Sequence, residues 1–168
     1  VGAGGGGMAL ISDNANVIVS NVTFEGNVLG FSGTGGGLYV ESDNDFLELR
    51  HVDFLSNKVV TSGFGGGMYL LRDNQNVEVS DCRFMRNGGY SSQGSGMFVL
   101  ENNDLMTVTD CVFSGNVGAG PTSLGGGLLV NADNYFFILN NSVLQDNIAE
   151  DGAALVFTLS NYDSVVQN

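Results

Sequence analysis

The segment from Gly35 to Asn57, GGGLYVESDNDFLELRHVDFLSN, decides the fold because it returns along the chain about every 30 residues. Each copy opens on a glycine-rich stretch and closes on an asparagine. The last glycines of the openings are Gly7, Gly37, Gly67, Gly96 and Gly127, with a weakened sixth copy, GAALVF, around Ala154. The sequence therefore predicts a repeat array, with residues 1–168 as a single segment.

Each copy has a part of fixed length and a connector of variable length. From Gly37 to Phe54 is 17 residues, and the same spacing holds in all five complete copies, the fifth having Leu144 in place of Phe. The distance from the closing asparagine to the last residue of the next opening, Gly37, Gly67, Gly96, Gly127 or Ala154, is 10, 10, 9, 11 and 7 residues. We expect the connectors, which are rich in Ser and Gly, to line one side of the fold; they span 28–34, 58–64, 88–93, 117–124 and 148–151.

Composition and charge exclude several classes of partner. The formal net charge of -13 comes from 18 acidic residues against five basic ones, which disfavours binding to nucleic acid. No apolar run approaches the roughly 20 residues of a membrane-spanning helix, so we expect no membrane insertion by this segment. Because the chain starts and stops within a unit, the sequence predicts a fragment of a longer array.

Apolar residues alternate with period two inside each unit, which is the period of β-strands. In the opening strand, Leu38 and Val40 are predicted to point inward. The inward residues are Leu47 and Leu49 in the second strand, and Val52 and Phe54 in the third. An Asp-Asn pair and a single polar residue such as His51 mark the bends, where a left-handed backbone is expected. These features predict an all-β fold: a single-stranded parallel β-helix, or solenoid, of about five to six rungs, each with roughly 30 residues and three short strands.

The motifs resemble the repeat of the polymorphic outer membrane proteins of chlamydial autotransporters, which carries a GGA-plus-aliphatic motif and an FxxN motif. The matches are GGGM at 5–8, GGGL at 35–38, GGGM at 65–68, GSGM at 94–97 and GGGL at 125–128, with FEGN, FLSN, FMRN and FSGN. The resemblance implies a right-handed coil in an extracellular or cell-surface protein with an adhesive or structural role. In contrast to that family, the third motif position holds Gly instead of Ala.

Two polar columns are candidate sites. The closing asparagines would stack into a structural ladder of amides, each donating to one neighbour and accepting from another. That ladder comprises Asn27, Asn57, Asn87, Asn116 and Asn147. Asp13, Asp43 and Asp73 in the bend column offer the carboxylate oxygens that calcium prefers, with a purely structural turn as the favoured alternative. No other cofactor is expected.

The two cysteines and two glycosylation motifs are further candidates. Cys82 and Cys111 fall in one inward column a rung apart, close enough for a disulfide, and buried free thiols fit equally well. The sequons at Asn21 and Asn140 predict N-glycosylation if the protein is secreted by a eukaryote.

The outward face of the opening strand is apolar where a solvated strand should be polar. We expect this face to be covered by a protein partner, a second copy, another part of the same long protein or a capping segment. Its residues are Tyr39, Tyr69, Leu71, Phe98, Leu100 and Leu129. No residue is predicted to be catalytic, because the repeat offers no singular cluster. The sequence thus predicts an extracellular structural or adhesive scaffold, and the alternative is a carbohydrate-binding or polysaccharide-degrading β-helix.

Overall fold

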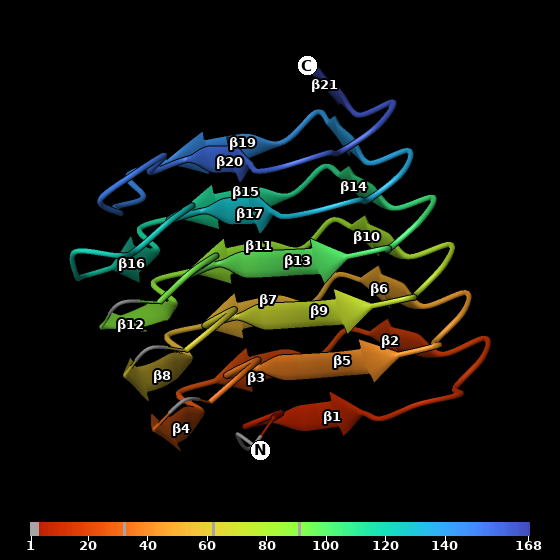
Figure 1. The fold of residues 1–168 in the computed structure, drawn as a ribbon. Helices are drawn as coiled ribbons and strands as arrows, with labels where there is room; N and C mark the ends of the chain where they lie inside the picture. Colours follow the sequence, from red (N-terminus) through yellow and green to blue (C-terminus); the bar gives the residue numbers. More distant parts are fainter. Residues whose placement is uncertain (1–3, 32, 62, 91) are drawn as a thin grey trace.

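A computed structural model describes residues 4–31, 33–61, 63–90 and 92–168, and it forms a stack of parallel β-strand rungs without any helix in those ranges (Figure 1). Four sheets run along the stack, and every strand pairs in parallel with its equivalent in the next rung. The all-β parallel β-helix with about 30 residues per rung is therefore confirmed.

The strands of the four sheets are these. The opening sheet holds β1 (Met8–Leu10), β5 (Leu38–Ser42), β9 (Met68–Arg72), β13 (Met97–Glu101), β17 (Leu128–Val130) and β20 (Leu155–Phe157). The second sheet holds β2 (Ile18–Ser20), β6 (Glu48–Arg50), β10 (Glu78–Ser80), β14 (Thr107–Thr109), β18 (Ile138–Asn140) and β21 (Val165–Gln167). The third sheet holds β3 (Thr23–Glu25), β7 (Asp53–Leu55), β11 (Arg83–Met85), β15 (Val112–Ser114) and β19 (Val143–Gln145). The connector sheet holds β4 (Val28–Phe31), β8 (Lys58–Thr61), β12 (Gly88–Tyr90) and β16 (Val117–Gly118).

The connector sheet is a fourth strand per rung that the sequence pattern did not predict. Its strands lie in segments that we expected to be irregular connectors. In β12, Gly88 and Gly89 carry no side chains, so no alternation of apolar and polar residues can mark the strand. Parallel pairing uses backbone N–H and C=O groups, which every residue type except proline supplies in full. Neighbouring rungs therefore impose the strand on a segment whose own sequence does not indicate it.

The interior is filled by the predicted inward columns. Leu38, Val40, Leu49 and their equivalents in the middle rungs are fully buried and form one continuous hydrophobic cluster. The phenylalanines of the third sheet stack along the axis: ring centroids are 5.2 Å apart for Phe24 and Phe54, 4.6 Å for Phe54 and Phe84, and 4.6 Å for Phe84 and Phe113. Because each ring contacts the rings above and below, burial is a property of the stack and not of one rung.

The bends have the left-handed backbone that their residue types favour. Asp43 has φ 54° at the Asp-Asn bend and His51 has φ 52° at the single-residue bend, and their equivalents in other rungs agree. Asp and Asn adopt this conformation more readily than other residues with side chains. The bends therefore recur at fixed positions, and the strands between them stay in register.

The closing asparagines form a hydrogen-bonded ladder. The side-chain amide of each residue donates to the Oδ1 atom of the next, at 2.8 Å from Asn27 to Asn57, 3.1 Å from Asn57 to Asn87, 3.1 Å from Asn87 to Asn116 and 2.9 Å from Asn116 to Asn147. The same amides, from Asn57 onward, donate to a phenylalanine carbonyl of the preceding rung. Each buried amide thus links three rungs.

A second asparagine ladder runs along the Asp-Asn bends, and the sequence reasoning missed it. The amide of Asn44 donates to Asn74 Oδ1 at 3.0 Å, and Asn74 donates to Asn103 Oδ1 at 3.0 Å. The complete ladder is Asn14, Asn44, Asn74, Asn103, Asn134 and Asn161. The Asp-Asn pairs predict only a turn, but the recurrence of asparagine at this position in every rung is the signal that its side chain points inward.

Replacing an asparagine in the middle of the closing ladder should strongly destabilise the fold. Asn87→Ala removes the side-chain donor to the Phe54 carbonyl and, in a buried site, the acceptor for the Asn57 backbone N–H and for one Asn57 side-chain N–H. Because an unsatisfied buried group costs about 1–3 kcal/mol, we expect the free energy of unfolding to fall by at least about 3 kcal/mol. Urea unfolding followed by circular dichroism measures this.

Asn27→Ala is the matched control, because Asn27 is only half-buried and lies at the end of the ladder. It should lose about 1 kcal/mol. Equal losses for the two variants would contradict the account of a cooperative ladder.

Candidate functional site

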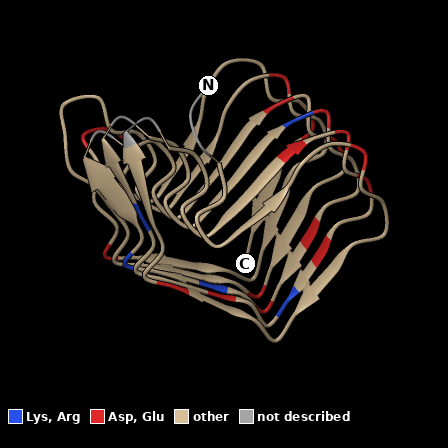
Figure 2. Cartoon of the chain, turned by 90° about the horizontal axis from the view of Figure 1, so that it is seen from below, with Lys and Arg blue, Asp and Glu red and all other residues tan. Residues whose placement is uncertain are grey.

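The apolar outward face of the opening sheet is covered by the chain itself. Tyr69, Phe98 and Leu129 are only 4%, 1% and 1% exposed and form a second hydrophobic cluster. In the view along the stack, the connectors turn back and return beside the opening sheet (Figure 2). Phe64 of the returning segment lies 5.9 Å from the Tyr69 ring and 5.5 Å from the Phe98 ring. Of the covers expected for this face, another part of the same chain is therefore the one that the structure shows over these three side chains.

The returning chain approaches the sheet closely at the glycine that follows Phe64. A Cβ atom on Gly65 would lie 2.8 Å from the Tyr69 Cβ atom, which is closer than contact allows. Tyr39, Leu71 and Leu100 remain partly exposed at the margin of this cluster. The signal available in the sequence was the aromatic or aliphatic residue, Phe64 or Leu124, that ends two of the connectors.

The aspartates of the bend column do not form a compact metal site. Asp13, Asp43 and Asp73 are exposed, one rung apart, and the guanidinium of Arg72 lies 3.7 Å from the Asp73 carboxylate. Within the described ranges, no three or more His, Cys, Asp or Glu side chains gather closely enough to hold a metal ion. Calcium binding at these residues stays a prediction.

The two cysteines lie in one inward column and are both free and buried. Their thiols donate to backbone carbonyls, Cys82 Sγ to Ser80 O at 3.1 Å and Cys111 Sγ to Thr109 O at 3.1 Å. Hydrogen bonding with the Cys82 sulfur and burial both raise the pKa of the Cys111 thiol. A thiol in this environment is a poor nucleophile and acts as a small core residue.

The two glycosylation motifs differ in their surroundings. Asn21 is exposed at a bend, whereas Asn140 is half-buried in β18, where it pairs with Thr109 and Gln167. Glycosylation at either residue stays a prediction, and Asn21 is the more accessible of the two.

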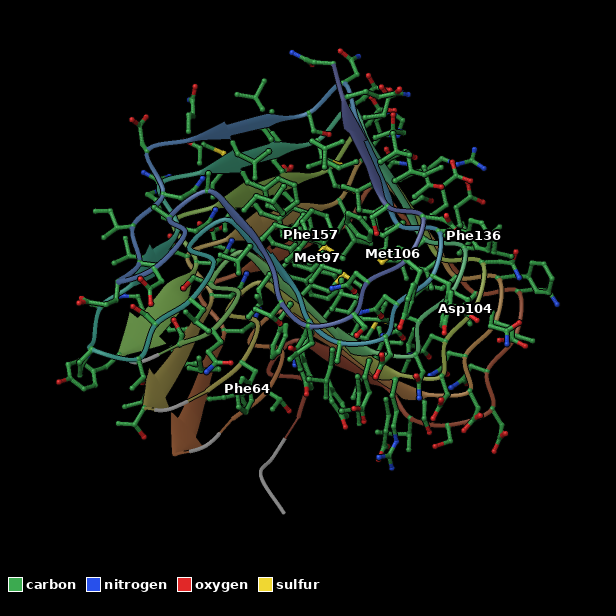
Figure 3. The ribbon with its side chains drawn as sticks, turned by 45° about the horizontal axis from the view of Figure 1, so that its top comes forward. Phe64, Met97, Asp104, Met106, Phe136 and Phe157 are labelled. Atoms are coloured by element: carbon green, nitrogen blue, oxygen red, sulfur yellow. The ribbon has the colours of Figure 1, made fainter. Side chains whose placement is uncertain are left out.

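Three bulky apolar residues occupy left-handed bend positions along one edge of the stack. Phe46, Leu105 and Phe136 have φ 57°, 56° and 56° and are 56%, 50% and 48% exposed. Figure 3 places Phe136 toward the outer edge, whereas Met97 and Met106 lie inside. The equivalent positions of two other rungs hold Asn16 and Asn76, the residue type that fits this conformation. The stack thus exposes apolar side chains where its own repeat also uses asparagine.

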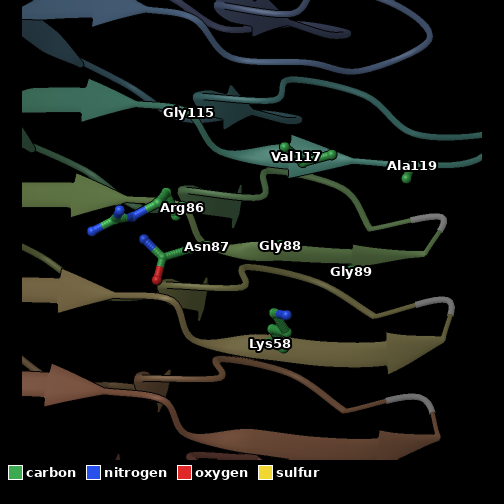
Figure 4. Close-up of a pocket in the computed structure, with 8 residues that line it drawn as sticks. All are labelled: Lys58, Arg86, Asn87, Gly88, Gly89, Gly115, Val117 and Ala119. Atoms are coloured by element: carbon green, nitrogen blue, oxygen red, sulfur yellow. The ribbon is translucent and has the colours of Figure 1, made fainter.

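A hollow of about 370 Å³ opens on the connector sheet (Figure 4). Its lining includes Lys58 and Arg86, two of the five basic residues of the chain, together with Gly88 and Gly89 of β12 and Val117 of β16. The sequence predicts that the connectors line one side of the fold, which is one of two places for a binding surface, but it does not single out these residues, because its basic residues stand in different columns of the repeat. Pairing across neighbouring rungs brings them to one depression.

Comparison with known proteins identifies the fold at the level of a family. The family model described as "Right handed beta helix region" matches residues 2–143. No curated protein matches the chain, and no solved structure matches it. The narrower resemblance to the polymorphic outer membrane protein repeat is not among these matches. No helix in the described ranges has the length and hydropathy of a membrane span.

The state of the cysteines can be measured directly. Because both thiols are free and buried, we expect no reaction with a thiol reagent in the native protein and two reactive thiols after unfolding in denaturant. Titration with and without denaturant, in the absence of reductant, makes the comparison. An unfolded protein without titratable thiols would instead establish a rung-to-rung disulfide.

Ionisation of Tyr69 should weaken the fold at alkaline pH. Burial raises the pKa of Tyr69, and its neighbours Tyr39 and Glu101 add to the shift. The unfolded chain ionises this phenol from about pH 10, while the folded protein keeps it neutral, so stability falls as the pH rises above 10. Urea unfolding between pH 8 and 12 should give a smaller alkaline loss for Tyr69→Phe than for the unmodified protein. Tyr90→Phe, at an exposed tyrosine, is the control and should not reduce that loss.

Proposed function

Because the chain belongs to the right-handed β-helix family, we propose that it is a structural or adhesive scaffold segment, extracellular or on a cell surface. The support for a scaffold is the continuity of its ladders. Two asparagine ladders and a stack of phenylalanine rings run through successive rungs without interruption. Such a stack resists bending and holds its surface residues at fixed spacings of about 4.8 Å per rung.

The observation that carries the adhesive part of this proposal is the edge formed by Phe46, Leu105 and Phe136, which we call the apolar edge. A bulky side chain is strained when its backbone lies in the left-handed region. In the chain without a partner, these exposed apolar side chains are not buried, so no hydrophobic stabilisation offsets the strain. Tyr135 and Tyr162, which stack at 4.8 Å and are partly exposed, extend the apolar edge toward the last rungs. Exposed aromatic residues of this kind are typical of protein interfaces.

The charge of the surface favours a protein partner over nucleic acid or anionic lipid. Acidic residues colour the edge where the opening strands end, and basic residues are sparse (Figure 2). A protein with this charge repels nucleic acid and anionic lipid. A lateral contact between scaffold segments or with another protein would therefore depend on apolar burial at the apolar edge.

The test replaces the three residues of the apolar edge by the residue that the repeat itself uses there. The triple variant Phe46→Asn, Leu105→Asn and Phe136→Asn should unfold at the same or a higher urea concentration, because Asn tolerates the left-handed backbone. We expect its association constant in sedimentation equilibrium, or the attachment to cells of beads that carry it, to fall about tenfold. A tenfold fall corresponds to the loss of roughly 1.4 kcal/mol of binding free energy.

Ile18→Thr with Val143→Thr removes exposed apolar side chains from other faces of the stack and serves as the control. It should leave both measurements unchanged. The proposal fails if the triple variant associates and attaches as well as the unmodified segment.

A further inference from the structure

The hollow on the connector sheet lies where the repeat is interrupted. The connector that contains Gly88 is one residue shorter than the two before it, and the pairing of β12 with β8 shifts register between Gly88 and Tyr90. Elsewhere the sheets align equivalent residues, as in the opening sheet, where Leu38 pairs with Met68. A surface feature at this rung is therefore not repeated along the stack.

Two glycines keep the hollow open. Gly88 has φ 145°, and a Cβ atom there would overlap the Val117 carbonyl oxygen. A Cβ atom on Gly89 would overlap the Val59 carbonyl oxygen in the rung below. Neither position can hold a side chain, so the surface of β12 stays bare between Lys58 below it and Val117 and Ala119 above it (Figure 4).

The cations beside the hollow are free, in contrast to the other basic residues. Arg50 pairs with Glu48, Arg83 pairs with Asp53, and Arg72 lies within 4.0 Å of Asp73 and Glu101. In the residue ranges that the structure covers, neither Lys58 nor Arg86 forms an ion pair, although the chain carries 18 acidic residues. The two exposed cations that lack a carboxylate partner therefore lie at the same depression.

The backbone at Arg86 gives a second, independent indication. Arg86 has φ 55°, and the equivalent positions in the other rungs hold Gly26, Ser56, Gly115 and Asp146. A long side chain is disfavoured in this conformation, and glycine is favoured. Strained positions of this kind gather at functional sites, where the surrounding structure maintains them. Arg86 is a residue that the fold tolerates and does not require.

We propose that this hollow binds a compact ligand through an oxyanion, namely a carboxylate, sulfate or phosphate group carried on a small polar molecule such as a sugar. The guanidinium of Arg86 can donate two parallel hydrogen bonds to such a group, and the ammonium of Lys58 adds a point charge. The volume lies at the small end of the range for small-molecule sites. This binding role goes beyond the scaffold function and does not depend on it.

A peptide fits this place less well than a small ligand. Strand addition requires a free sheet edge, but β12 is paired with β8 on one side and with β16 on the other. An amphipathic helix requires an elongated apolar groove, whereas the lining of this hollow contains three glycines and two cations. The chemistry of the site therefore favours a small molecule that carries a single anionic group.

The test compares four probes that share one sugar ring: glucuronate, glucose 6-sulfate, glucose 6-phosphate and neutral glucose. Titration of the whole chain, followed by shifts of backbone amide signals in NMR, should detect saturable binding of at least one anionic probe at the amides of Gly88, Gly89 and Val117. Neutral glucose should produce no saturable shift. The anionic probe that binds most tightly identifies the source of the oxyanion, and binding should weaken as salt is added.

Arg86→Gly separates binding from folding, because glycine is the native residue at two equivalent positions. This variant should unfold at the same or a higher urea concentration and bind the anionic probe at least about tenfold more weakly. Lys58→Gln should also weaken binding, whereas Arg50→Gln, at a cation outside the hollow, should not. Absence of binding for all three anions, equal binding of glucose, or full affinity in Arg86→Gly would each overturn the proposal.

Discussion

Hydrogen bonding between equivalent residues of successive rungs is the interaction on which the whole structure depends. Backbone groups of every sheet pair only with the rungs above and below, and both asparagine ladders do the same with side chains. The two asparagines of a unit, such as Asn44 and Asn57, are 13 residues apart in every complete copy. A residue inserted between them would displace one ladder against the other and leave buried amides unpaired. This requirement explains why length varies only in the connectors.

Much of the fold can be predicted from the sequence, because each ladder requires a similar residue at the same position of every rung. This requirement appears in the sequence as a repeat of about 30 residues. The inward columns, the left-handed bends and the parallel stacking could all be predicted from residues such as Leu38, Asp43 and Phe54, which have equivalents in every rung. Strand β12 of the connector sheet could not be predicted, because Gly88 and Gly89 pair through the backbone alone. A cover over Tyr69 was expected but the covering residue was not identified, since Phe64 reaches it by a chain reversal.

The candidate surfaces were less predictable than the fold, because they lie at departures from the repeat and not in the repeat itself. Phe136 and Arg86 have the same backbone conformation as the Asn or Gly of other rungs, so only the structure makes their strain apparent. The hollow between Lys58 and Val117 lies where one connector is one residue shorter than the connector before it and two residues shorter than the connector after it. A comparison of equivalent positions in the folded stack therefore distinguishes residues that stabilise the coil from residues that are not needed for its stability.

The asparagine ladders also give the stack a direction. In every rung the side-chain amide donates toward the C-terminal end and the oxygen accepts from the N-terminal side, for Asn27 through Asn147 and for Asn14 through Asn161. Their dipoles therefore add along the axis, as peptide dipoles do in a helix. Each rung therefore presents acceptor oxygens toward the N-terminal side and amide hydrogens toward the C-terminal side. A further rung can continue such a ladder only in the same orientation, head to tail, which is a polar arrangement and not a two-fold symmetric one.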